Sequence, residues 1–110
     1  MKFYILSFLL VSFANIIKSQ PVITSFSPTA APAGSQIVIN GAGFSNTSAN
    51  NIVYFGAVKA VVSSSIINAI TVIVPVGATY NPLSVTTGNL TAISSNCFIP
   101  TFSGGDSNFT

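Results

Sequence analysis

The chain has 110 residues, and only 4% of them are charged: three Lys, one Asp and no Arg, Glu or His. Soluble domains usually carry about 25% charged residues. Because catalysis by proton transfer or nucleophilic attack depends on paired titratable side chains, this composition excludes most enzyme classes, and we expect no catalytic residue, no metal site and no cofactor. The length fits one domain.

The first 19 residues have the layout of a secretory signal peptide. Lys2 and Lys18 flank an uncharged, largely apolar run over residues 3–17. The apolar stretch of a signal peptide takes about 7–15 residues, whereas a helix that spans a bilayer needs about 20. We therefore predict a signal peptide over residues 1–19 and no membrane span in the mature chain. Small residues favour cleavage after Ser19, with cleavage after Ala14 as the alternative.

Export and charge together define the expected location and exclude some partners. No Cys follows the apolar run within the first 20 residues, so a lipid-anchored Cys is not expected and the chain is predicted to be secreted or at the cell surface. The mature chain then holds Lys59 and Asp106, whose charges cancel, so a nucleic-acid partner lacks its electrostatic footprint. The single Cys97 lies beside Phe98 and Ile99, and is predicted to be a buried small hydrophobe.

From residue 21 onward, short apolar runs alternate with Gly, Pro, Asn and Ser, and no run keeps the period of a helix. The runs are rich in Val, Ile, Thr, Phe and Tyr, which favour strands. Their spacing of about 8–12 residues predicts an all-β chain and favours a β-sandwich over a barrel. The expected strands cover residues 22–26, 36–40, 52–55, 58–63, 69–74, 83–86 and 90–98.

Alternation along these strands separates a core face from an outer face. Four outward positions carry apolar side chains that a neighbouring molecule could cover: Val38, Ile52, Tyr54 and Ile73. The side chains predicted to point inward are Ile37, Ile39, Val53, Phe55, Ile70, Val72, Val74, Leu83 and Val85, and Phe26, Phe44 and Phe98 are expected to join them in the core.

Two segments carry a recognisable motif: PVITSFSP at residues 21–28 and AGSQIVINGAGF at residues 33–44. They resemble the start of an IPT/TIG domain, an immunoglobulin-like β-sandwich. In that family the first strand ends in a Pro-containing turn, a Gly precedes the second strand, and that strand closes with Gly-x-x-Phe. Residues 53–56, 70–75 and 82–87 look like later strands of the same pattern. The motif residues are Pro28, Gly34, Gly41, Gly43, Phe44 and Pro75.

The resemblance covers residues 21 to about 99 and implies an immunoglobulin-like sandwich of about seven short strands, preceded by the signal-peptide helix. It places the domain at residues 20–99. Residues 100–110 are then a flexible linker or the start of a truncated downstream region. The motif residues shape the backbone and the end of the sandwich, and they carry no chemistry of their own.

The family includes intracellular DNA-binding proteins, receptor ectodomains and bacterial surface proteins, and this chain resembles the last group. The resemblance implies a non-catalytic exported module that serves as a structural spacer or as an adhesion or interaction domain, with neighbouring domains, a surface protein or a glycan as partners. The alternative is a carbohydrate-binding accessory domain of a secreted or surface glycan-utilisation protein. Exposed aromatic rings can stack on sugars, so Tyr54 and Tyr80 are the candidate ligand-binding residues.

Overall fold

The computed structural model describes residues 20–102. The signal peptide predicted over residues 1–19 and most of the linker predicted over residues 100–110 lie outside the described residues. Within them the chain is all-β, which confirms the predicted fold class. The elements are β1 (Val22–Ser27), β2 (Ala30–Pro32), β3 (Gln36–Ala42), the short 3-10 helix η1 (Ser48–Asn50), β4 (Asn51–Phe55), β5 (Val58–Ile66), β6 (Ala69–Ile73), β7 (Asn81–Thr87) and β8 (Leu90–Thr101).

Each of the seven predicted strands is present in its expected order, and the structure adds β2. This strand has only three residues and ends at Pro32, so no strand signal marks it in the sequence. It forms because β8 continues to Thr101, past the predicted end at residue 98, and pairs in parallel with β2 from Ile99 onward. The additional strand β2 and the longer β8 therefore have one cause, because the two segments pair with each other.

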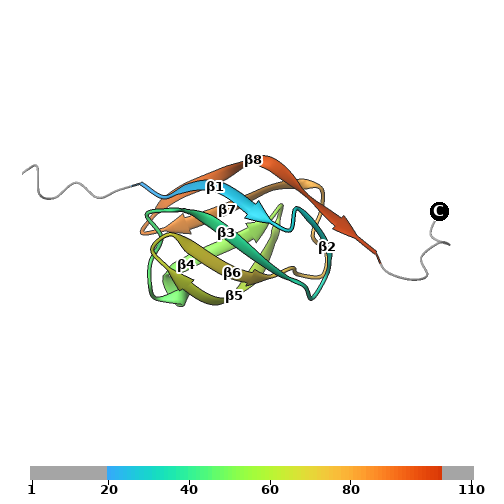
Figure 1. The fold of residues 1–110 in the computed structure, drawn as a ribbon, viewed down its shortest axis with the longest axis horizontal. Coiled ribbons are helices and arrows are strands. Elements are labelled where there is room, and N and C mark those ends of the chain that lie inside the picture. The colour runs from blue at the N-terminus through green and yellow to red at the C-terminus, as the bar shows by residue number, and fades with distance from the viewer. Residues whose placement is uncertain (1–19, 103–110) are drawn as a thin grey trace, which may run out of the picture.

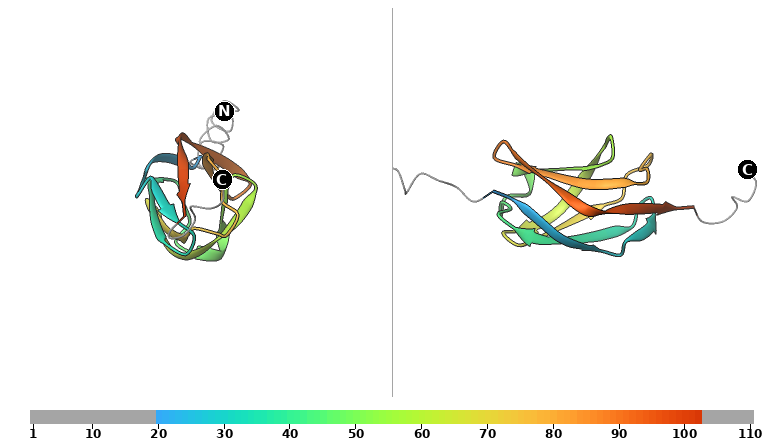
Figure 2. Two further views of the ribbon diagram at one scale, coloured as in Figure 1. Left: turned by 90° about the vertical axis from the view of Figure 1, so that its right-hand side faces the viewer. Right: turned by 90° about the horizontal axis from the view of Figure 1, so that it is seen from above.

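The strands form two layers around a single core (Figure 2). One layer is β1-β3-β6-β5 and the other is β5-β4-β7-β8-β2. β5 belongs to both layers, because residues 58–60 pair with β4 and residues 61–66 pair with β6. Apart from the β2–β8 pair, all pairings are antiparallel. The arrangement is that of an immunoglobulin-like β-sandwich.

The core contains every side chain that was predicted to point inward. These residues lie on β3, β4, β6 and β7 or, for Val74, directly after β6, and they are at most 2% exposed. Phe26, Phe44 and Phe98 are buried with them. The Phe98 ring lies at the centre of an aromatic group. Its centroid is 5.0 Å from that of Phe55, with the two rings nearly perpendicular, and 6.4 Å from that of Phe26. Edge-to-face packing of this kind adds to the stability gained from burial alone.

The four side chains predicted to point outward lie on outer faces: Val38, Ile52 and Tyr54 are exposed, and Ile73 is half-buried between Gln36 and Val61 of the neighbouring strands. One prediction about a side chain needs correction. Cys97 is half-buried rather than buried. The reason is alternation along β8: Phe98 takes the inward position, so the preceding residue faces outward.

The described chain enters and leaves the sandwich at opposite ends of its long axis. β1 begins at one end, and β8 ends at the other (Figure 1). Within the long final strand, a bulge opposite Leu83 interrupts the ladder between β7 and β8. There the buried Ser94 hydroxyl accepts the Leu83 N–H at 2.9 Å and donates to the Asn96 carbonyl at 2.7 Å. The irregular stretch therefore leaves this backbone donor satisfied and lets β8 reach across the domain.

Candidate functional site

The two candidate tyrosines lie on different parts of the domain. Tyr54 is on β4, directly opposite Lys59 of β5 and Ser84 of β7, and its side chain is 36% exposed on the outer face of that sheet. Tyr80 precedes β7 in the loop after β6 and is 66% exposed. They are not cross-strand neighbours, so no paired aromatic clamp follows from the strand register.

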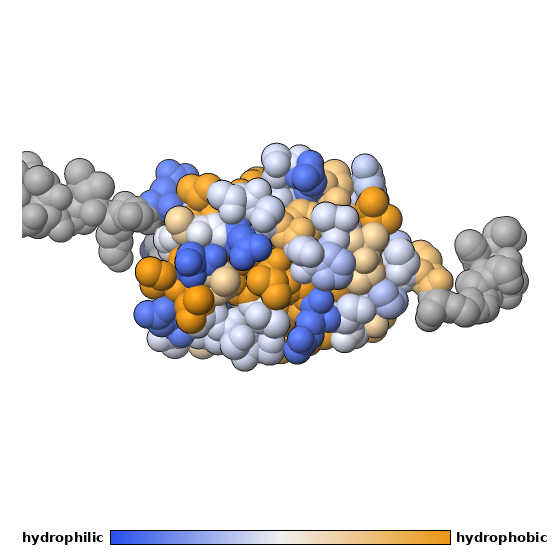
Figure 3. Space-filling model, viewed as in Figure 1, coloured by the Kyte–Doolittle hydropathy of each residue, from blue (hydrophilic) through white to orange (hydrophobic). Residues whose placement is uncertain are grey.

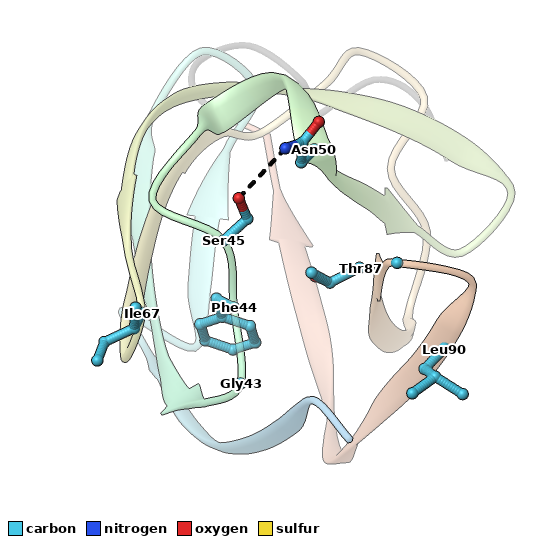
Figure 4. A pocket seen from close by; sticks show the side chains of 8 residues that line it. Gly43, Phe44, Ser45, Asn50, Ile67, Thr87 and Leu90 are labelled. Carbon is cyan, nitrogen blue, oxygen red and sulfur yellow. Dashed lines mark hydrogen bonds between the residues drawn. The ribbon is translucent and has the colours of Figure 1, made fainter. Parts of the chain in front are cut away.

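A hollow of about 650 Å³ opens at the end of the sandwich where β1 begins (Figure 4). Three connections form it: the loop from β3 to β4, the turn from β5 to β6 and the turn from β7 to β8. The side chains of Phe44, Ile67 and Leu90 supply its apolar part, and Ser45, Asn50 and Thr87 supply hydroxyl and amide groups. The hollow is therefore neutral and mixed in polarity, and none of the residues singled out as ligand-binding candidates lines it.

Asn51 is the residue that fixes the polar side of this hollow, and it is 4% exposed. Its Nδ2 donates to the Ser45 carbonyl at 2.9 Å, and its Oδ1 accepts the Ser45 N–H at 3.0 Å and the Thr87 hydroxyl at 2.8 Å. Ser65 adds a hydroxyl bond to the same carbonyl at 2.8 Å. The Asn51 amide thus ties the loop after β3 to β4 and β7. A buried amide that lacks hydrogen-bond partners is costly, so these bonds hold the loop in place.

We expect Asn51→Ala to lower the free energy of unfolding by about 2 kcal/mol, since it leaves the Ser45 N–H and the Thr87 hydroxyl without their acceptor, while the Ser45 carbonyl keeps only its bond from Ser65. Urea denaturation measures the change. The matched control is Asn50→Ala, because Asn50 is exposed and its side chain makes a single bond, at 3.4 Å, to the Ser45 hydroxyl. Equal losses for the two variants would contradict the role assigned to the buried amide.

The residues of the sequence motif lie at turns and close contacts of the backbone. Pro28 follows β1, Gly34 precedes β3 with φ +92°, and Pro75 follows β6. Gly41 lies in β3 and Gly43 just after it. Residues 20–22, at the start of the domain, pass close over both glycines. A Cβ on Gly41 would overlap the carbonyl oxygen of Val22, and a Cβ on Gly43 would lie 2.8 Å from the carbonyl oxygen of Gln20. Phe44 is buried beside them.

Charged and metal-ligating groups are scarce in the described part of the chain. Lys59 is the one charged side chain among residues 20–102, and these residues contain no group of three His, Cys, Asp or Glu side chains that could hold a metal ion. The only other titratable side chains in this range are Tyr54, Tyr80 and Cys97. None of the helical structure found within residues 20–102 is long and apolar enough to cross a membrane.

The fold and the backbone motif define an immunoglobulin-like module. The family model of the IPT/TIG domain matches residues 21–102, so the chain belongs to the IPT/TIG family. This confirms the resemblance seen in the sequence and extends it three residues further, through the part of β8 that pairs with β2. No curated protein sequence matches the chain.

Solved structures share the fold at low sequence identity. An auxiliary nutrient binding protein from Bacteroides ovatus ATCC 8483 has a TM-score of 0.75 and 21% identity over 78% of this chain. An auxiliary nutrient binding protein from Bacteroides thetaiotaomicron VPI-5482 has a TM-score of 0.72 and 17% identity over 76% of this chain. A protein crystallised with a xylogluco-oligosaccharide has a TM-score of 0.63 and 18% identity over 78% of this chain. The chain covers 22%, 21% and 21% of these three proteins, about a fifth of each, so the likeness concerns one module of larger chains.

Proposed function

We propose that the chain is a non-catalytic, exported immunoglobulin-like module that serves as a structural spacer or interaction domain in a bacterial cell-surface or secreted protein. The observation that carries this proposal is the path of the backbone. It enters at one end of the long axis with β1 and leaves at the other with β8 (Figure 1). A module with this path can hold whatever follows β8 a full domain length away from its own N-terminal end.

Two further observations support a module with neighbours rather than an enzyme. The surface around the exit of β8 is apolar: Val76 is 85% exposed, Phe102 is 77% exposed, and both line a hollow with Pro100. Exposed apolar surface of this kind is typical of contacts between domains. The titratable side chains in the described range, in contrast, include one cross-strand pair, Tyr54 and Lys59, and no carboxylate that could act as a base beside them.

The spacer proposal makes a prediction about the gene downstream of the domain. We expect the reading frame to continue past the Thr110 codon into at least one further folded domain, because a spacer needs something to hold at its exit. Sequencing of the nucleotides downstream of that codon tests this. A stop codon directly after Thr110 would contradict the spacer role and leave a single small secreted domain.

Export predicts a defined mature N-terminus. We expect cleavage after Ser19, so that intact-mass spectrometry of the secreted protein shows a chain beginning at Gln20; cleavage after Ala14 would leave five further residues. The backbone at Gln20 and Pro21 already lies against Gly43, so this cut preserves the first residues in contact with the fold. Retention of Met1 in a chain that stays inside the cell would contradict export.

A carbohydrate-binding accessory domain is the second candidate. The likeness to nutrient binding proteins and to a protein crystallised with a xylogluco-oligosaccharide favours it, as does a surface rich in hydroxyl and amide groups with few charges. Its test is direct binding of the purified chain to a glycan array. Binding to at least one glycan is expected for the accessory domain, whereas a pure spacer binds none.

A further inference from the structure

The two outer faces of the sandwich differ in chemistry. On β3 and β6, the exposed residues Gln36 and Asn40 and the half-buried Thr71 surround Val38, and Figure 3 shows this side as a mixture of polar and apolar patches. The opposite outer face lies on β5, β4, β7 and β8. It has two adjacent rows, and we name it the Tyr54 face. Its residues are Lys59, Tyr54, Ser84 and Ile93 in one row, and Ile52, Thr86 and Thr91 in the next. Val61, which pairs with Ile73 of β6, lies at the edge of this face and borders the same hollow as Ile52.

The two cross-strand neighbours of Tyr54, Lys59 and Ser84, each border a hollow that Tyr54 itself does not line. One has a volume of about 550 Å³ and is bordered by Ile52, Lys59 and Val61. The other has a volume of about 480 Å³ and is bordered by Ser84 and Ile93. A ligand that lay across the sheet would therefore contact the tyrosine ring at its middle and enter a depression on each side, an arrangement suited to an extended polymer.

The only charge of the described residues lies on the same face. Lys59 is exposed and directly opposite Tyr54 on the neighbouring strand, and directly opposite residues have Cβ atoms about 4.5–5.5 Å apart. Residues 20–102 contain no Asp or Glu that could pair with it. The cation beside the ring is thus available to an anionic group of a ligand.

Neutral hydrogen-bonding groups complete the face. The Thr86 and Thr91 hydroxyls bond each other at 2.8 Å, which uses one hydroxyl hydrogen and leaves the other free to donate. Ser84 adds a half-buried hydroxyl directly beside Tyr54. These groups match the three parts of an acidic sugar. The aromatic ring can stack on the C–H face of the sugar, the hydroxyls can hydrogen-bond to its hydroxyls, and the ammonium can pair with its carboxylate.

The geometry points to a binding site on the Tyr54 face for a polysaccharide of uronic acids, in which a sugar ring stacks on Tyr54 and a carboxylate pairs with Lys59. This inference rests on the second candidate function, carbohydrate binding, and names its site and its ligand class. A flexible acidic segment of another protein satisfies the charge but not the stacking surface, and the experiment separates the two.

The experiment uses the secreted mature protein in affinity electrophoresis through gels that contain polygalacturonate, neutral xyloglucan or polyglutamate. We expect retardation in polygalacturonate that weakens as salt is raised. Tyr54→Val, which keeps a strand-forming residue, and Lys59→Gln each weaken this binding about tenfold. Lys59→Arg retains it. Val38→Ala, on the opposite outer face, leaves it unchanged, and circular dichroism confirms that each variant is folded.

Three outcomes would overturn the inference, and they differ in their consequence for the proposed carbohydrate binding. Equal binding of both polysaccharides, unaffected by Lys59→Gln, would contradict the preference for acidic sugars and would still support carbohydrate binding. Retardation by polyglutamate as strong as by polygalacturonate replaces the glycan with an acidic protein segment. No retardation by any of the three polymers removes the Tyr54 site together with its ligand class and leaves the spacer role, while the glycan array still decides carbohydrate binding as a whole.

Discussion

Replacing Phe98 with Ala is expected to lower the free energy of unfolding by about 3–5 kcal/mol, the range seen when a large buried aromatic side chain is removed. The Phe98 ring is fully buried and contacts both Phe55 and Phe26, whose strands lie in different layers. The described part of the chain has one Cys and therefore no disulfide that could offset the loss. Since small domains are stable by about 5–15 kcal/mol, this loss removes a large share of the total stability.

Urea denaturation followed by circular dichroism measures this effect, and the chain supplies its own control. Phe102→Ala makes the same change four residues further along, at a side chain that is 77% exposed, and should alter stability by no more than about 0.5 kcal/mol. If both variants had similar denaturation midpoints, the aromatic group would not be what holds the two layers together. A large loss at Phe102 alone would place the important contacts at the exit of β8.

The sequence predicts the strands and their faces well, because each depends on local alternation. Val53 and Phe55 alternate with Ile52 and Tyr54, and the structure buries the first pair and exposes the second. The error at Cys97 shows what happens when alternation is set aside. Its apolar neighbours indicated burial, whereas its parity relative to Phe98 indicates the outer face, and parity is what the pleated strand obeys.

Interactions between distant residues could not be predicted in the same way. The Asn51 amide and the Thr87 hydroxyl are 36 positions apart, and they meet only because β4 and β7 pair in a register that joins these two residues. A register shift of one residue would move every side chain of a strand to the other face, so such a contact is a property of the assembled sheet. The hollow built around this bond has no signature in the sequence.

The candidate Tyr54 face could be predicted from the sequence only in part, because some of its residues follow from local alternation and others from the pairing of distant strands. Tyr54 was singled out by its parity opposite Phe55, and its partner Lys59 follows from the tight turn between β4 and β5, since Phe55 pairs with Val58 and Tyr54 with the next residue. Ser84 and Ile93 come from strands that the sequence leaves unpaired. The aromatic ring and the cation were therefore within reach of sequence reasoning, but their hydroxyl and apolar neighbours were not.

Gly41→Ala is expected to be the most disruptive change of a single methyl group in this domain. A Cβ at this position overlaps the carbonyl oxygen of Val22 and lies 2.8 Å from the tip of the Phe44 ring. The oxygen belongs to β1, which pairs with β3 at this point, so the clash cannot be relieved by a side-chain rotation. We expect β1 to move away from β3 near its start and the free energy of unfolding to fall by about 2–4 kcal/mol.

Gly34→Ala separates this steric effect from the loss of glycine's conformational freedom. Gly34 has a φ of +92°, but a methyl group on its Cα would have no atom within 4 Å, so Ala there meets backbone strain and no clash, and should cost about 1 kcal/mol. Urea denaturation compares the two variants, and amide hydrogen exchange should show lost protection in β1 for Gly41→Ala alone. Similar costs with equal protection of β1 would contradict the steric role, because the close passage of β1 over Gly41 would then not explain why a glycine stands there.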